Sequence, residues 1–328
     1  MDMTERETTA RTWHGDERDN GFDMQATIRS DVSFTGVGLH TGSLARMTIR
    51  PHAANMGLWF RRMDLPGRPL IAARYDLVSQ SRLCTRLDAD GGASVSTIEH
   101  VMAALAGCGI HNALVEIDGP EVPILDGSAA PFVRGIIDAG IQRQASGIHA
   151  IEVTREIVVT DGPAMAKLTP FEGLEMDFSI DFADAAIGRQ RRVANLANGR
   201  FVREYCDSRT FCRQADVDAM HAAGLALGGT YDNAVVVDGD AVLSPGGFRH
   251  ADEAVRHKML DALGDLALAG APLRARYTGV RAGHMLTNKL LRALFATPGA
   301  TRVVECTPEQ AARLPGMGVK VADLAHVA

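Results

Sequence analysis

The chain has 328 residues, of which 46% are hydrophobic and 23% are charged, a balance typical of a globular protein with a large core. Its net charge of −6 lacks the basic surplus that general nucleic-acid binding requires. No run of 18 apolar residues occurs, and the N-terminal stretch lacks the apolar segment of a secretory signal. Five cysteines without a CxxC pair favour a reducing compartment. We therefore expect a cytoplasmic protein with no membrane span.

The order of polar and apolar segments predicts two domains between two short extensions. Residues 1–23 carry seven acidic and three basic side chains, which favours a disordered extension. Residues 24–147 and 148–300 each begin with alternating, strand-like segments and continue into helical ones. Residues 301–328 form a tail that ends in an apolar segment. That apolar end leads to the hypothesis of a degradation signal recognised by a regulatory protease.

The first long helix is expected after an alternating N-terminal region. Ser96 and Glu99 have the spacing of a capping box, and apolar residues follow to about Gly107. Glu99 and His100 then fall in the first turn. They fit either a capping glutamate beside a half-buried histidine, or a metal ligand with a general base next to it.

A second helix is predicted over residues 251–269, with Asp252 as N-cap and Gly270 as a stop signal. His257, Asp261 and Asp265 recur every four residues, so their side chains share one face. This stripe fits either a solvated face with a His–Asp pair or a metal site. Buried carboxylates are costly unless they are paired or bind a metal.

Three segments together would supply a hydrolytic metal site, although spacing alone cannot bring them together. Catalytic zinc takes three nitrogen or oxygen ligands and one water, and His100, His257 and Asp261 meet that count. Glu99 would act as general base on the water. His284, after Gly283, would stabilise an oxyanion and protonate a leaving nitrogen, and Asp265 would orient its ring and raise its pKa.

Five segments carry a resemblance to a known family, and it extends from about Thr27 to Ala296. In chain order they are GVGLHTG, STIEHVMAALAG, EVPILDGSAAPF, RHKMLDALGDL and AGHMLTNKLL. Together they resemble the UDP-3-O-acyl-N-acetylglucosamine deacetylases, the zinc enzymes of the committed step of lipid A synthesis in Gram-negative bacteria. The resemblance implies a cytoplasmic hydrolase that acts on an acylated sugar nucleotide.

The resemblance also implies a role for individual residues. One Zn²⁺ per chain would be held by His100, His257 and Asp261, and Fe²⁺ suits the same N/N/O set. Glu99 would be the base, Thr210 a donor to the oxyanion, and His284 the general acid or electrostatic stabiliser supported by Asp265. The residues implied near the substrate are Lys258, Phe211, Leu83 and Cys84, with His40 in a neighbouring loop.

The fold implied by the resemblance is α+β: a two-domain α/β sandwich whose helical layers face each other. Each domain would pair a mostly antiparallel sheet with two helices, and the second would carry a βαβ insert at about residues 211–237. The insert would form a passage for an acyl chain, lined by Val217, Leu225, Ala226, Leu227 and Val236. One departure is Cys212-Arg213, where the family often has Gly-Phe. Arg213 would then either pair with a phosphate or point to solvent.

The expected reaction is hydrolysis of the acetamide of UDP-3-O-[(3R)-3-hydroxyacyl]-N-acetylglucosamine to UDP-3-O-acyl-glucosamine and acetate. Two alternatives stay open. One is a zinc amidase of the same fold that acts on another N-acyl compound. The other is a non-catalytic module that binds a sugar nucleotide and whose metal is structural.

Overall fold

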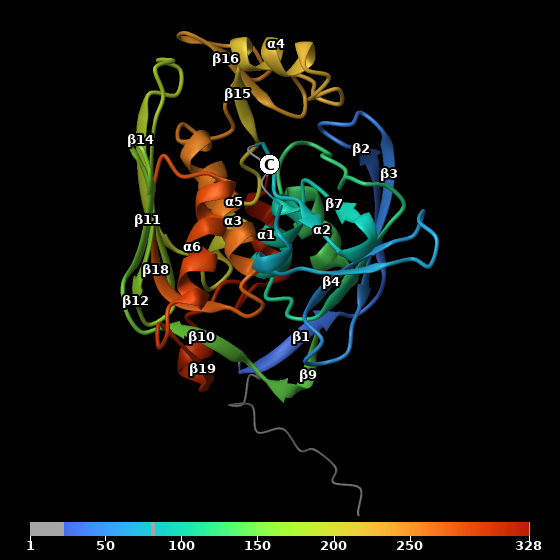
Figure 1. The fold of residues 1–328 in the computed structure, drawn as a ribbon, viewed down its shortest axis with the longest axis vertical. Helices are drawn as coiled ribbons and strands as arrows, with labels where there is room; N and C mark the ends of the chain where they lie inside the picture. The colour runs from blue at the N-terminus through green and yellow to red at the C-terminus, as the bar shows by residue number, and fades with distance from the viewer. Residues whose placement is uncertain (1–22, 80–82, 328) are drawn as a thin grey trace, which may run out of the picture.

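The computed structural model describes residues 23–79 and 83–327. The extension predicted over residues 1–23 therefore lies outside the described residues, except for Asp23. Two main sheets form the outer layers, and helices fill the space between them (Figure 1). The prediction of an α+β fold with facing helical layers is confirmed.

The first sheet has the strand order β2-β3-β8-β4-β5, in which only the β8–β4 pair is parallel. Its strands are β2 (Val32–Val37), β3 (Leu44–Pro51), β4 (Leu58–Arg62), β5 (Leu70–Ala72) and β8 (Ala113–Ile117). The central strand β8 reads ALVEI and is buried at four of its five residues, as expected for a strand with a neighbour on each side.

The second sheet follows the order β11-β12-β18-β10-β19, and the β13–β14 pair joins it through β18. Its strands are β10 (His149–Val153), β11 (Ile157–Asp161), β12 (Ala164–Pro170), β13 (Leu174–Asp181), β14 (Arg189–Asn195), β18 (Leu273–Val280) and β19 (Thr301–Glu305). In β13 every second side chain is buried, because one face of the strand lies on the helices.

Smaller ladders join the remaining strands: β1 (Met24–Ile28) with β9 (Ile141–Gly147), β6 (Leu87–Asp88) with β7 (Ser94–Val95), and β15 (Phe211–Arg213) with β16 (Val235–Asp238) and β17 (Ala241–Val242). The helices are α1 (Glu99–Gly107), α2 (Ala130–Ala139), α3 (Arg200–Glu204), α4 (Gln214–Ala222), α5 (Glu253–Ala267), α6 (His284–Ala296) and α7 (Pro308–Ala311). The described residues also form short 3-10 helices: η1 (Tyr75–Leu77), η2 (Asp90–Gly92) and η3 (Val321–His326).

The βαβ insert is confirmed, and it consists of β15, α4 and the parallel strand β16. It stands at one end of the molecule, at the top of Figure 1.

The two large sheets are built from residues on opposite sides of Gly147, and on this ground we propose the domain boundary there. The C-terminal stretch contributes β19 to the second sheet, and the Arg203 guanidinium holds the Asp323 carboxylate at 2.5 Å. Within the described residues, no helix has the length and apolarity needed to cross a membrane.

The capping box predicted for the first helix is wrong. Helix α1 begins at Glu99, and its N-cap residue is Ile98, which offers no side-chain acceptor. The Ser96 hydroxyl instead donates to the Pro120 carbonyl at 3.1 Å. The Glu99 carboxylate accepts the Thr85 backbone N–H at 3.0 Å, so tertiary contacts take the two groups that the capping box would have used.

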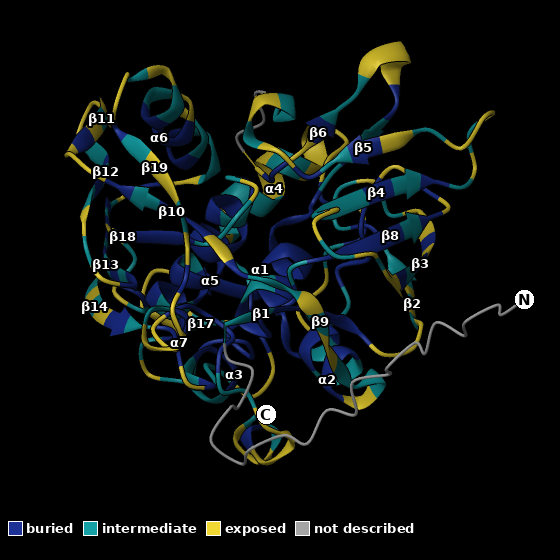
Figure 2. Cartoon of the chain, turned by 90° about the horizontal axis from the view of Figure 1, so that it is seen from below, coloured by how far each residue is buried: buried dark blue, intermediate teal, exposed yellow. Residues whose placement is uncertain are grey.

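Helices α1 and α5 cross in the buried centre of the molecule, where Figure 2 shows both in dark blue. Gly264 of α5 meets the backbone of Glu99 at the crossing. A Cβ atom on Gly264 would lie 2.1 Å from the Glu99 carbonyl oxygen and 3.1 Å from the Ala103 nitrogen. Only a residue without a side chain allows this approach, which places the start of α1 against the middle of α5.

We expect Gly264→Ala to destabilise the fold by about 1–3 kcal/mol, although alanine is the better helix former, because the added methyl group must push α1 and α5 apart. Thermal unfolding measures the effect. Gly119→Ala is the matched control, since its Cβ would meet its nearest neighbour at an ordinary 3.5 Å. Equal melting temperatures for wild type and Gly264→Ala would contradict the packing argument.

His111 ties β1 to the segment before β8. Its backbone N–H donates to the Ala26 carbonyl at 2.8 Å, and its Nδ1 accepts the Ala26 N–H at 3.1 Å. Burial lowers the pKa of His111 to about 4, and the nearby Arg143 charge adds to the shift. The fold therefore favours the neutral imidazole.

Because the pKa of an unfolded histidine is about 6.5, the stabilisation from neutral His111 is complete above that pH and is lost as the pH falls toward 4. We expect the decrease in unfolding free energy between pH 6.5 and 4 to be smaller in His111→Gln than in wild type. Urea titrations across this range measure it. His149→Gln, which removes an exposed histidine, should keep the wild-type slope. The same slope in all three proteins would refute the role of His111.

Candidate active site

The three predicted metal donors lie together at the α1–α5 crossing. One ligand atom each from His100, His257 and Asp261 can be chosen so that all three lie within 4.8 Å of one another. All three residues are at most 4% exposed. His257 and Asp261 are one turn apart on α5, and His100 is the second residue of α1, so the helix crossing completes the group.

The chemistry of this donor set fits a divalent cation. His257 directs its Nδ1 to the Ser208 carbonyl at 2.9 Å, which leaves Nε2 facing the cluster. The Asp261 Oδ1 atom is buried without a hydrogen-bond partner and lies 3.2 Å from the His257 Nε2 atom and 3.6 Å from the His100 Nε2 atom. A buried carboxylate oxygen needs a partner, and a cation held between this oxygen and the two imidazoles would supply one.

The charges around the donors favour metal-binding protonation states. Burial would raise the pKa of Asp261, but its interactions with His257 and Lys258 outweigh burial and hold that pKa well below its usual range. Burial lowers the pKa of His100, which keeps its imidazole neutral. An ionised carboxylate and a neutral imidazole are the forms that bind metals.

Glu99 and His284 face each other beside the donors. The His284 Nε2 atom lies 3.7 Å from the Glu99 Oε1 atom. Burial raises the pKa of Glu99 to about 8, against the opposing effect of His284. Burial would lower the pKa of His284, but Asp265 and Glu99 raise it to about 10. The pair thus combines a carboxyl group whose basicity is increased by burial with an imidazolium able to give a proton.

Asp265 orients His284, as the sequence predicts. Its Oδ2 atom lies 2.9 Å from the His284 Nδ1 atom, and both side chains are at most 10% exposed. The Lys258 ammonium lies 2.8 Å from the Asp261 Oδ2 atom, so this predicted substrate residue contacts a predicted metal donor directly.

A cavity of about 1060 Å³ opens from the donors toward the insert. The predicted site residues that line it are His257, Asp261, Lys258, His284, Thr210, Phe211, Leu83, Val217, Leu225, Ala226 and Val236. His40 also lines it, with both ring nitrogens buried and unpartnered among the described residues. Five predicted site residues are not among the lining residues: Leu227, which is 58% exposed, and the buried residues Glu99, His100, Asp265 and Cys84.

Phe211 and Arg213 occupy different parts of this cavity. The centroid of the Phe211 ring lies 6.2 Å from the centroid of the His257 ring and 5.4 Å from the centroid of the Phe182 ring. Phe211 and Phe182 thus form an aromatic wall beside the donors. Arg213 forms a two-pronged ion pair with Asp216, in which both N–O distances are 2.7 Å. Its guanidinium is thus held by α4 rather than left unpaired for a phosphate.

Glu121, which lies outside the predicted set, holds a loop at the cavity. The buried Glu121 carboxylate accepts hydrogen bonds from the Thr97 hydroxyl at 2.8 Å and from the backbone N–H groups of His40 and Thr41, each at 2.9 Å. The signal for Glu121 in the sequence is an acidic residue between two prolines, Pro120 and Pro123, in one of the motifs of the family resemblance.

A buried ion pair holds the loop that carries Thr210. The Arg209 Nε atom lies 2.9 Å from the Glu253 Oε1 atom, and both side chains are at most 7% exposed. The Arg209 backbone N–H donates to the same oxygen at 2.9 Å. This pair fixes the residue before Thr210 to the first turn of α5, and the sequence gives no periodic pattern that would reveal it.

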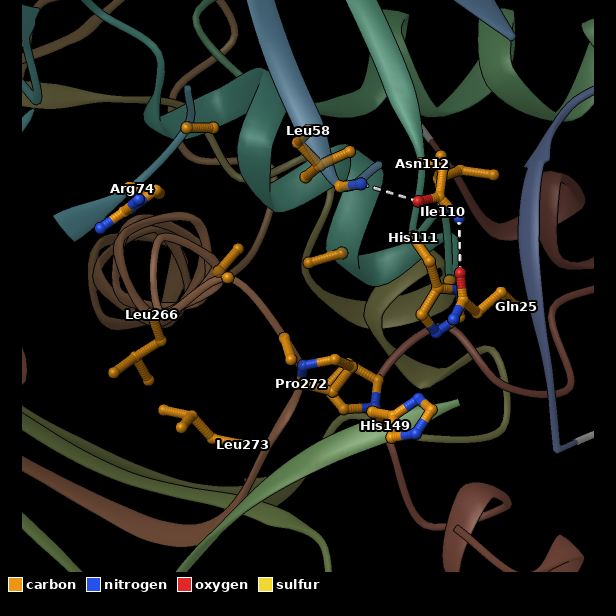
Figure 3. Close-up of a pocket in the computed structure, with 18 of the residues that line it drawn as sticks. Gln25, Leu58, Arg74, Ile110, His111, Asn112, His149, Leu266, Pro272 and Leu273 are labelled. Atoms are coloured by element: carbon orange, nitrogen blue, oxygen red, sulfur yellow. Dashed lines mark hydrogen bonds between the residues drawn. The ribbon is translucent and has the colours of Figure 1, made fainter. Parts of the chain in front are cut away.

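A second cavity, of about 420 Å³, lies at the other ends of α1 and α5 and contains none of the predicted site residues. Figure 3 shows Leu266 of α5 on one side of it and Asn112 opposite. The Asn112 amide donates to the Gln25 side chain and accepts the Gly57 N–H, at 2.8 and 2.7 Å. These polar groups are hydrogen-bonded to one another, and the cavity contains no predicted site residue. We therefore assign the chemistry to the larger cavity.

Comparison with known proteins fits this geometry. The family described as UDP-3-O-acyl N-acetylglycosamine deacetylase matches residues 25–296. The chain belongs to this family. Two relatives named UDP-3-O-acyl-N-acetylglucosamine deacetylase, from Anaeromyxobacter sp. (strain Fw109-5) and Phenylobacterium zucineum (strain HLK1), are each 47% identical to it. Those alignments cover 87% and 85% of this chain and 93% and 96% of the relatives.

A relative of the same name from Pasteurella multocida (strain Pm70) is 42% identical over 88% of this chain and 95% of its own length. The matched residues of the family contain every predicted metal donor and catalytic residue, from Glu99 to His284. The fold and the site therefore belong to one continuous region of family resemblance.

We expect the purified protein to hold about one divalent metal ion per chain, and His257→Ala to lose it, because the variant removes one of three donors. Elemental analysis after gel filtration measures the metal. His149→Ala removes an exposed histidine far from the donors and should retain the ion. Equal metal content in His257→Ala and wild type would place the metal elsewhere.

Proposed function

We propose that this chain hydrolyses the acetamide of UDP-3-O-[(3R)-3-hydroxyacyl]-N-acetylglucosamine to UDP-3-O-acyl-glucosamine and acetate. Membership of the family and the names of the relatives support this reaction. The observation that carries it is that the Glu99–His284 pair lies beside three metal donors, and that His257, Asp261 and His284 line one large cavity. This hydrolysis is the committed step of lipid A synthesis.

The donors His100, His257 and Asp261 would hold one Zn²⁺, and Fe²⁺ suits the same two imidazoles and one carboxylate. When bound, the metal supplies Lewis acidity toward the acetamide carbonyl and toward water. The five cysteines form no disulfide, which supports a reducing, cytoplasmic location.

Glu99 takes a proton from the attacking water, since its buried carboxylate faces the donors and gains basicity from burial. The water oxygen adds to the acetamide carbon, and negative charge develops on the carbonyl oxygen. Thr210 and the His284 imidazolium, which both line the cavity, stabilise that charge in this proposal. His284 then protonates the nitrogen, and the C–N bond breaks to give acetate and the free amine.

Substrate selection is assigned to the cavity walls. Val217, Leu225, Ala226 and Val236 give the insert an apolar surface that suits an acyl chain, and Leu83 adds to it from the opposite loop. Phe211 offers an aromatic face for the sugar nucleotide. Cys84 is buried and is not among the residues that line the cavity, so its predicted substrate contact stays a prediction. The hypothesis of a protease that recognises the C-terminal tail stays a prediction.

The function is tested by acetate release from the 3-O-(3-hydroxyacyl) substrate and from a control compound without the acyl chain. We expect release that depends on the acyl chain and on the metal. Equal release from both compounds would instead favour an amidase with a different N-acyl substrate. Tight binding without release from either would favour a binding module with a structural metal.

We expect Glu99→Gln to lower kcat about 100-fold to 10,000-fold with bound metal retained, because the amide cannot accept the water proton. Steady-state acetate release and elemental analysis measure the two quantities. Glu156→Gln, which neutralises an exposed carboxylate in the loop between β10 and β11, is the control and should keep wild-type kcat. Near-wild-type turnover in Glu99→Gln with metal bound would show that another group is the base.

A further inference from the structure

Thr85 lies between the two carboxylates that flank the proposed chemistry. Its hydroxyl donates to the Asp265 Oδ1 atom at 2.5 Å, and its backbone N–H donates to the Glu99 Oε2 atom at 3.0 Å. The two acceptors belong to different helices, α5 and α1. One residue outside both helices therefore contacts the base and the carboxylate that orients the general acid.

Each carboxylate uses one oxygen for Thr85 and turns the other toward the site. The second oxygen of Asp265 contacts the His284 Nδ1 atom at 2.9 Å. The second oxygen of Glu99 lies 3.7 Å from the His284 Nε2 atom. Because a carboxylate rotates as a plane, a hydrogen bond that fixes one oxygen also fixes the direction of the other. The four residues form a closed ring: Thr85, Asp265, His284 and Glu99.

Thr85 acts on these groups and not on the substrate. It is 2% exposed and does not line the large cavity. Its carbonyl accepts the Ile98 N–H at 3.3 Å, so its backbone also holds the residue that precedes α1. The burial of Thr85 thus keeps water from the two carboxylate oxygens that it contacts. A water molecule could replace the hydrogen bond from its hydroxyl only if the packing changed.

We propose that Thr85 is a positioning residue that fixes Glu99 and the Asp265–His284 pair in their working orientations. The proposal rests on the proposed function, since it assigns a task to groups of that reaction. The backbone N–H of Thr85 holds Glu99, and its hydroxyl holds Asp265. Only the second contact depends on the side chain, so a substitution separates the two.

Thr85→Val keeps the shape and the backbone contacts but leaves the Asp265 Oδ1 atom without its donor. We expect kcat to fall about 10-fold to 100-fold, the range for hydrogen-bond partners that orient the groups of a metal site, with KM changed less than about threefold and metal content unchanged. Thr85→Ser retains the hydroxyl and should recover most of the wild-type kcat. An unchanged kcat in Thr85→Val, or a loss in Thr85→Ser as large as in Thr85→Val, would overturn the proposal.

A double-mutant cycle separates positioning from a general structural role. If the hydroxyl acts through Asp265, adding Thr85→Val to Asp265→Ala should lower kcat less than about twofold further. Two independent, multiplicative losses would overturn the proposal. Should Thr85→Val fail to fold, Thr85→Ala takes its place in the cycle.

A spectroscopic readout tests the same contact without turnover. The ¹⁵N and ¹H resonances of the His284 Nδ1–H group should shift in Thr85→Val and return in Thr85→Ser, while the melting temperature reports on the fold. Unchanged resonances would overturn the proposal. Wild-type acetate release is measured first: without it the proposed function fails, whereas wild-type release with full activity in Thr85→Val removes only the role of Thr85.

Discussion

The contact between the backbone of α1 and Gly264 of α5 is the constraint on which the site depends. Since no side chain separates the helices there, the start of α1 lies against the middle of α5. His100 of α1 can then reach His257 and Asp261, and Glu99 can face His284 at the start of α6. A wider separation of the helices would leave each domain with an incomplete set of groups. The interface between the two helical layers therefore also forms the proposed active site.

This interface concentrates charge where burial makes charge expensive. Glu99, Asp261 and Asp265 are each 4% exposed, and their positive partners are Lys258 and His284. The surroundings shift the pKa values of two carboxylates in opposite directions. Burial raises the pKa of Glu99, whereas neighbouring positive charge lowers the pKa of Asp261. A divalent cation among the donors would supply the remaining positive charge, so metal binding and stability at this crossing are coupled.

Local patterns in the sequence predict most of the elements and fewer of their contacts. The helix at residues 251–269 is observed as α5, because its His–Asp–Asp face follows from helical periodicity alone. The capping box at Ser96 failed because Glu99 makes a contact with Thr85, which no local pattern contains. Arg213 likewise pairs with Asp216 across one turn of the insert. The union of three distant segments into one site came from family resemblance, since residue spacing carries no information on helix crossing.

Chemistry and substrate selection occupy parts of the fold with different packing. The donors sit on α1 and α5, where nearly every residue is buried, and any change of volume there must be absorbed by two domains. The insert helix α4 has no buried residue, yet Val217 of that helix lines the same cavity. Substitutions on α4 can therefore reshape the cavity without disturbing the core. Under the proposed function, the preferred acyl chain could therefore change through α4 while the proposed hydrolytic groups stay fixed.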